Sequence, residues 1–293
     1  ANSPAFEAGT LPGDILYQVD GEAVTGKDLD LVVKENIRGE EGTYVDITVL
    51  RGENAEETPL HVERRSIEVP TVEYQMLENQ VGYIYVTQFD EVTAKQFEDA
   101  IDDLEDQGME KLVIDLRNNP GGVLDTAVEM LAYVLPEDKL DGMLVYTADK
   151  NGEGDRYFCK DGKIQRESDD GSRDSRYPKE DDHELDVPLA VLVNGNSASA
   201  SEVFTGAVMD YDAGIVVGTT TFGKGIVQNL IPLGDGTAIK LTTAHYYTPN
   251  GFDLHGKGLE PDVVVEMDEE LQKKAVVELS EDNQLQAAIE AMN

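Results

Sequence analysis

The chain has 293 residues, enough for one large domain or two smaller ones. It carries 60 acidic and 23 basic residues, and this net charge of −37 repels nucleic acid and disfavours binding to an anionic membrane surface. Its single cysteine, Cys159, cannot form an internal disulfide and has no partner at zinc-ligand spacing. No apolar run approaches the roughly 18 residues of a membrane span. We therefore expect a soluble, globular protein.

Residues 1–67 form one small α+β module. The segment "DILYQVDG" predicts a strand that ends in the turn Asp20-Gly21, and an amphipathic helix follows over about 27–37. The alternating "TYVDITVL" predicts a half-buried strand. Strands and helices are mixed here within a length too short for a large core.

Residues 68–293 alternate strands with helices, which predicts an α/β layered core. A stretch at 149–187 is very polar, and we expect it to be a solvated loop because it offers little apolar surface to offset chain ordering. The expected strands are 81–89, 111–116, a hairpin at 143–159, 188–194, 214–233 and 237–249. The expected helices are 93–108, 124–136, one ending near 210, and 282–292.

The segment "VLVNGNSASASEVFTGAV" at 191–208 joins a buried strand to a helix through small residues. A strand-to-helix turn can present a hydroxyl to a substrate, so Ser197, Ser199 and Ser201 are candidate nucleophiles. The alternative is an ordinary Ser-rich helix N-cap. The segment alone does not decide between these readings.

A serine needs a neighbouring group that accepts its proton. Lys224 in "TTTFGKGIVQ" is the preferred candidate, because it lies between two glycines beside an apolar strand, where desolvation favours a neutral amine. His245 and His255 remain alternatives for a Ser-His pair. A phosphate-binding role for Lys224 is disfavoured, because the GxxxxGK[ST] pattern is absent.

Four segments occur in the order typical of one family: "DLRNNPGG", "GNSASASEVF", "VVGTTTFGKGIVQ" and "HYYTPNGFDLHGKGLEPDVVV". Together they resemble the C-terminal processing peptidases, also called tail-specific proteases. The earlier segment "AGTLPGDILYQVDGEAV" resembles the second half of a PDZ domain, whose opening strand and carboxylate-binding loop would precede residue 1. The resemblance implies a crotonase-like (ββα-layered) α/β peptidase core over 68–293, joined to a truncated PDZ domain over 1–67.

The resemblance also implies roles for individual residues. The nucleophile is the middle serine of the run, Ser199, and the base lies 25 residues later, at Lys224. Gln228 is expected to hold the lysine amine, and Asp210 is a candidate supporting residue. Oxyanion donors are expected at Gly121, Gly122 and Ala200, and a PDZ groove would be lined by Leu29, Val32 and Val33, whose alternative role is core packing.

We therefore expect a serine endopeptidase that uses no cofactor or metal and cleaves polypeptides near their C-termini, with the PDZ module recognising the tail. Its expected partners are unfolded protein tails, a regulatory protein and a further copy of itself, at an extracytoplasmic site with tethering by an N-terminal segment. The alternatives are a catalytically silent PDZ scaffold and a crotonase-like acyl-CoA enzyme. The acidic surface counts against an anionic CoA substrate.

Overall fold

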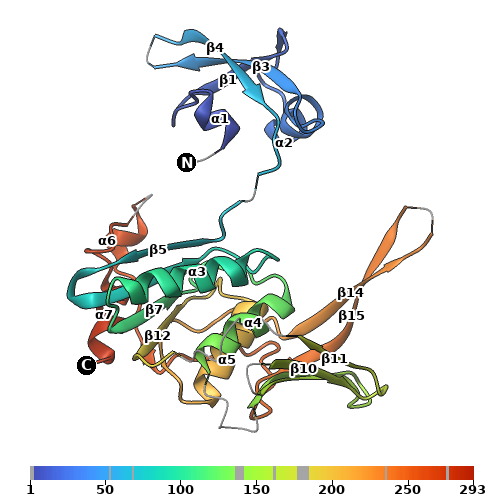
Figure 1. The fold of residues 1–293 in the computed structure, drawn as a ribbon, viewed down its shortest axis with the longest axis vertical. Coiled ribbons are helices and arrows are strands. Elements are labelled where there is room, and N and C mark those ends of the chain that lie inside the picture. The colour runs from blue at the N-terminus through green and yellow to red at the C-terminus, as the bar shows by residue number, and fades with distance from the viewer. Residues whose placement is uncertain are drawn as a thin grey trace. The chain divides into compact units, whose positions relative to one another are not determined.

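The structure is a computed structural model that describes residues 3–52, 54–67, 69–135, 142–160, 163–176, 185–234, 236–274 and 277–293. The chain divides into two compact units, Ala1–Val69 and Pro70–Asn293, which are described separately (Figure 1). No helix among the described residues is long and apolar enough to cross a membrane.

The first unit is a four-stranded antiparallel sheet in the order β2-β1-β3-β4, accompanied by short helices. The sheet packs on a small core of valines and one isoleucine that includes Val32. Its elements are α1 (Pro4–Glu7), β1 (Ile15–Val19), β2 (Glu22–Ala23), α2 (Leu29–Val32), the π-helical turn η1 (Val33–Ile37), β3 (Tyr44–Arg51) and β4 (Glu56–Glu63).

Two sets of polar interactions stabilise the turns of this unit. Asp28 caps α2 by accepting the N–H of Leu31, as expected of an N-cap aspartate. Arg51 at the end of β3 forms two hydrogen bonds to the carboxylate of Asp14, which also accepts the N–H of Leu11. This pairing lowers the pKa of Asp14 to about 2, chiefly through the Arg51 hydrogen bonds.

The second unit is built on a six-stranded sheet in the order β16-β13-β12-β7-β6-β5. Its strands are mutually parallel except β5, which pairs antiparallel at the edge. The strands are β5 (Val72–Met76), β6 (Val81–Val86), β7 (Lys111–Asp115), β12 (Leu189–Val193), β13 (Ile215–Gly218) and β16 (Val263–Val264), and η2 (Glu78–Gln80) joins the first two.

Helices cover both faces of this sheet, as buried parallel strands require. The helices α3 (Thr93–Asp106), α4 (Leu124–Val134) and α5 (Ala200–Asp210) contribute side chains to the larger core, with Phe97, Leu131 and Phe204 fully buried. On the other face α7 (Asn283–Ala291) buries Leu285 and Ala288 against β7, β12 and β13. The short helix α6 (Glu269–Gln272) precedes it.

A second, antiparallel sheet runs in the order β11-β10-β9-β8-β15-β14. Figure 1 shows the β14–β15 hairpin extending away from the body of this unit. The strands are β8 (Met143–Ala148), β9 (Asp155–Lys160), β10 (Lys163–Ser168), β11 (Arg173–Arg176), β14 (Ile226–Pro232) and β15 (Ala238–Tyr247).

The structure corrects two expectations from sequence. The polar stretch 149–187 is not simply a loop, because β9, β10 and β11 pair antiparallel within it; residues 161–162 and 177–184 of that stretch lie outside the described residues. The segment 214–233 is two strands of different sheets, β13 and β14, separated by the glycine turn that carries Lys224. The expected hairpin at 143–159 is confirmed by the β8–β9 pairing.

Candidate active site

Three neighbouring parallel strands bring the sequence motifs together. β12 pairs with β7 on one side and with β13 on the other, all in parallel. The carboxyl ends of parallel strands meet at one edge of the sheet. The loops that follow β7, β12 and β13 carry "RNNPGG", "NGNSAS" and "TTTFGKG", so the fold places these motifs side by side.

The three serines of the run have different environments. The Ser197 hydroxyl donates to the Leu116 carbonyl at 2.8 Å, and the Ser201 hydroxyl donates to the Asn119 carbonyl at 3.0 Å, both fully buried. Ser199 is partly exposed at the N-terminus of α5. Its φ of 57° and ψ of −117° form a strained conformation for a non-glycine residue, of the kind that clusters at functional sites.

Glu202 connects Ser199 to the lysine turn. Its Oε2 accepts the main-chain N–H of Ser199 at 3.0 Å and that of Lys224 at 2.7 Å. Its Oε1 accepts the Thr221 hydroxyl and the Gly223 N–H, each at 2.6 Å. The side chain is completely buried, and four donors offset the cost of burying a carboxylate.

Sequence reasoning did not single out Glu202, although a signal was present. Ser-x-x-Glu at a helix start is the capping-box pattern, in which the glutamate accepts the N–H of the capping serine. Here the same carboxylate also reaches Gly223 and Lys224 of a distant segment. That second role is created by the packing of two loops and cannot be read from local spacing.

Lys224 follows Gly223, whose φ of 85° and crowding against Lys257 and Gly258 favour glycine. The Phe222 N–H donates to the Ser197 carbonyl, which joins the lysine turn directly to the serine run. Within the described ranges Lys224 Nζ forms no hydrogen bond with Ser199 or with Gln228. The Gln228 amide instead donates weakly to the Thr242 hydroxyl at 3.4 Å, on the exposed hairpin.

The loop after β7 is positioned by Asn119. Its buried side chain donates to the Val86 carbonyl at 2.8 Å and accepts the Gly121 N–H at 2.9 Å, while its carbonyl accepts the Ala198 N–H. A Cβ on Gly121 would lie 2.7 Å from the Ser199 Cβ and 2.8 Å from the Ala200 nitrogen. Only glycine therefore fits at this approach between the two loops.

A buried ionic group braces the base of the same loop. Arg117 pairs with Asp115 at 2.5 Å and with Asp282 at 2.7 Å, and it also donates to Gln284. Burial alone would lower the pKa of Arg117, but the bonds to both aspartates outweigh it and raise the pKa. Tyr83 donates to Asp115, and burial together with that charge raises the Tyr83 pKa.

The two alternative bases form a separate cluster. His245 Nδ1 lies 3.3 Å from the Asp253 carboxylate, and the His245 and His255 rings meet edge to face at 4.9 Å. Burial alone would raise the pKa of Asp253, but the hydrogen bonds from the His255 main-chain N–H and the His245 ring outweigh it and lower that pKa. The part of the chain that the structure describes contains no hydrogen bond between either histidine and Ser199.

Asp210 lies at the opposite end of α5 from Ser199, about 16 Å away at the rise of a helix. Its carboxylate accepts the Asn250 N–H at 2.7 Å. At this distance Asp210 does not contact Ser199, and a supporting role for Asp210 remains a prediction.

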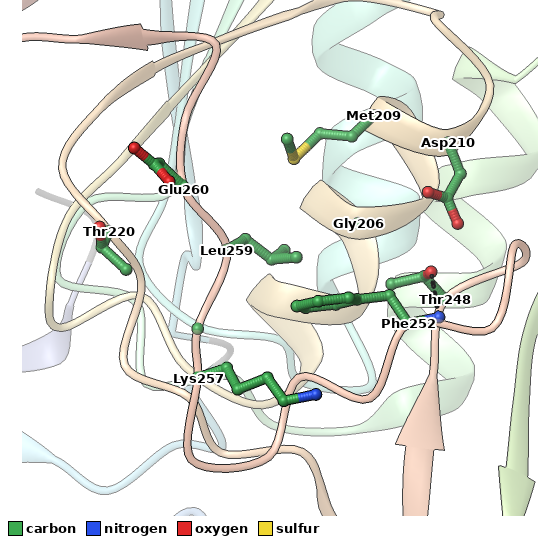
Figure 2. A pocket seen from close by; sticks show the side chains of 10 residues that line it. Gly206, Met209, Asp210, Thr220, Thr248, Phe252, Lys257, Leu259 and Glu260 are labelled. Atoms are coloured by element: carbon green, nitrogen blue, oxygen red, sulfur yellow. Dashed lines mark hydrogen bonds between the residues drawn. The ribbon is translucent and has the colours of Figure 1, made fainter.

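Asp210 also borders a pocket of about 510 Å³, shown in Figure 2, where Met209, Leu259 and Phe252 surround the space beside α5. Neither Ser199 nor Lys224 is among the residues that line this pocket.

In the first unit, the groove residues predicted from sequence differ in exposure. Leu29 is exposed and Val33 is partly buried, but Val32 is only 3% exposed and belongs to the core. The expectation that Val32 lines a groove is therefore corrected. Val32 is buried because it lies on the apolar, inward-facing side of the short helix α2.

The arrangement of a strained serine, a lysine turn and a glycine loop at one sheet edge is accompanied by clear similarity to known proteins. The profile of peptidase family S41 matches residues 80–265. The probable CtpA-like serine proteases of Staphylococcus aureus and Staphylococcus haemolyticus are each 39% identical over 264 residues, covering 90% of this chain and 48% of theirs. The chain belongs to peptidase family S41, and it spans about half the length of these curated relatives.

Solved structures agree with this assignment. The photosystem II D1 C-terminal processing protease is 30% identical, with a TM-score of 0.53 over 95% of this chain and 68% of that one. A putative S41 protease from Bacteroides fragilis has a TM-score of 0.59 at 19% identity, covering 99% of this chain and 75% of that one, and supports the fold. The α/β peptidase core expected from the sequence is confirmed.

Proposed function

We propose that the protein is a serine peptidase in which Ser199 is the nucleophile and Lys224 the general base. The observation that carries this proposal is the shared acceptor Glu202 Oε2. Because two hydrogen bonds end on one oxygen, the main-chain nitrogens of Ser199 and Lys224 lie no more than about 6 Å apart. Side chains on two residues so placed are within reach of each other once their rotamers allow it.

The reaction follows from these groups. The neutral Lys224 amine takes the hydroxyl proton as Ser199 Oγ attacks the peptide carbonyl carbon, and the resulting ammonium returns that proton to the leaving amine when the C–N bond breaks. Water then attacks the ester carbon, Lys224 takes a proton from that water, and the proton passes to Ser199 Oγ as the ester C–O bond breaks. Lysine can serve as this base because its amine, unlike a guanidinium, can lose a proton.

Two main-chain donors are proposed for the oxyanion, those of Gly122 and Ala200. The Gly121 N–H is engaged by Asn119, which leaves its neighbour Gly122 as the donor from this loop. Among the described residues neither the Gly122 N–H nor the Ala200 N–H has an acceptor. Ala200 is the first residue of α5, where main-chain N–H groups lack helical partners and the helix dipole favours negative charge.

The position of Gln228 implies a movement before catalysis. For Gln228 to hold the Lys224 amine, as the family pattern implies, its amide oxygen must accept from Lys224 Nζ, a bond that is not formed while the amide nitrogen donates to Thr242. Gln228 lies on an exposed strand four residues after Lys224, and its bond to Thr242 is long. We propose that this rearrangement accompanies activation of the Ser199 and Lys224 pair.

We further propose that the crotonase-like core cleaves polypeptides near their C-termini and that the first unit is a PDZ-like module that recognises the tail. The similar D1 protease is named for C-terminal processing. Leu29 and Val33 remain candidates for the groove of this module. An extracytoplasmic location, a membrane tether, a regulatory partner and self-association belong to the same proposal.

The direct test is reaction with a fluorophosphonate, which modifies activated serines. We expect one adduct on the wild-type chain and none on Ser199→Ala. Labelling of both proteins to the same extent would refute the assignment of the nucleophile.

A further inference from the structure

The edge of the sheet next to the proposed base has a free main chain. β14 is the last strand of its sheet and, among the described residues, pairs only with β15. It begins at Ile226, two residues after Lys224, and residues 228–232 are all exposed. An unpaired strand edge is a template for another extended chain.

The direction of the main-chain groups on β14 follows from its pairing. The Gly225 carbonyl accepts the Tyr246 N–H, and the Leu233 N–H donates to the Thr237 carbonyl. Odd-numbered residues therefore direct their polar groups toward β15, and even-numbered residues direct theirs to the open edge. Ile226, Gln228 and Leu230 offer outward N–H and C=O groups, whereas Pro232 has no N–H and ends the series of donors.

The side chains of this hairpin suit an uncharged, apolar chain. Leu230 is 69% exposed, and on the other face Ile231, Ile239 and Leu241 are each nearly half exposed. Residues 226–247 contain one acidic and one basic residue, in a chain with a net charge of −37. This neutral surface avoids the repulsion that the rest of the molecule exerts on acidic polypeptides.

From this placement we infer that β14 binds the polypeptide substrate as an added strand, through the outward main-chain groups of Ile226, Gln228 and Leu230. This inference rests on the proposed peptidase function, since it concerns how substrate reaches Ser199. Main-chain pairing gives affinity without a fixed sequence, and the exposed aliphatic side chains favour apolar substrate residues. The rival occupant is β14 of a second copy.

The first experiment uses peptides with an apolar C-terminus, each N-methylated at a different one of six consecutive amides. Strand addition predicts that methylation at alternate positions lowers kcat/KM about tenfold, the loss expected for one main-chain hydrogen bond, while intervening positions change it little. A uniform response along the peptide would overturn the inference.

The second experiment removes one outward donor with Leu230→Pro. The matched control is Ser175→Pro on β11, because Ser175 directs its main chain outward at the opposite edge of the same sheet, where the described residues pair β11 only with β10. We expect Leu230→Pro to lower kcat/KM on peptides about tenfold, with Ser175→Pro unchanged and fluorophosphonate labelling of both retained. Unchanged peptide cleavage by Leu230→Pro would contradict the inference.

The readouts separate the possible failures. If the wild-type chain does not react with the fluorophosphonate, the proposed function fails, whatever the edge binds. If labelling is normal, the methylation response is uniform and Leu230→Pro dissociates a dimer measured by light scattering, the edge pairs with a second copy and the substrate inference is wrong.

Discussion

The main-chain N–H groups of Ser199 and Lys224 donate to the same carboxylate oxygen of Glu202, at 3.0 and 2.7 Å. Residues 25 positions apart, on loops that follow different strands, are thereby held by one buried group. The other oxygen holds Thr221 and Gly223 of the lysine turn. The relation between the proposed nucleophile and the proposed base thus depends on a residue that takes no part in the proposed chemistry.

Replacing Glu202 by Gln should therefore lower activity strongly. One carboxylate oxygen would become an NH₂ group facing two donors, so two hydrogen bonds would be lost in a buried site. We expect kcat to fall by about a hundredfold and the free energy of unfolding by about 2–4 kcal/mol. The control is the exposed Glu260→Gln, which should retain both values. A wild-type kcat in Glu202→Gln would contradict the proposed role of Glu202 in positioning Ser199 and Lys224.

The three serines should separate in mutagenesis. Ser201→Ala removes one buried hydrogen bond to the β7 loop, and we expect it to cost about 1 kcal/mol of stability. Ser197→Ala also removes the acceptor of the Asn194 N–H, so we expect a cost of about 2 kcal/mol, and both variants should retain measurable activity. Ser199→Ala should abolish peptide cleavage with an unchanged circular dichroism spectrum. Initial rates and urea unfolding of the three variants provide the test. Equal loss of activity in all three would contradict the choice of Ser199.

Arg117→Lys should destabilise the second unit. Lysine cannot reproduce the planar donors that join Asp115 to Asp282, so buried carboxylates would lose partners. We expect a loss of about 3 kcal/mol in urea unfolding. A variant with unchanged stability would show that this group does not fix α7 to the β7 loop.

The first unit should lose stability in acid. The folded pKa of Asp14, about 2, lies below its ordinary value of 3.8, so its contribution to stability is complete above pH 4 and is lost as the pH falls toward 2. Asp14→Asn should lower stability at pH 6 and flatten its change between pH 4 and 2. Thermal unfolding across this range is the measurement. A parallel pH response in variant and wild type would contradict the role of Asp14.

The sequence predicted much of this architecture because local signals and the fold agree. The helix at 93–108 and the hairpin at 143–159 follow from periodicity and turn residues, and α3, β8 and β9 confirm them. The polar strands β10 and β11 could not be predicted, because antiparallel pairing holds them, β10 with β9 and β11 with β10, and Ile164 is the single buried side chain of β10. The two roles of Glu202 likewise depend on tertiary packing, whereas the distance from Asp210 to Ser199 follows from the length of one helix.

The most direct test of the central claim is to locate the fluorophosphonate adduct by peptide mass spectrometry in the wild type, in Lys224→Arg and in Lys224→His. The guanidinium of arginine cannot give up its proton near neutral pH. A neutral imidazole can accept a proton, but the histidine side chain is shorter than that of lysine. We predict a single adduct on Ser199 in the wild type, none above background in Lys224→Arg and a trace in Lys224→His. Rapid labelling of Ser199 in Lys224→Arg would contradict Lys224 as the base and would favour His245 or His255 in that role.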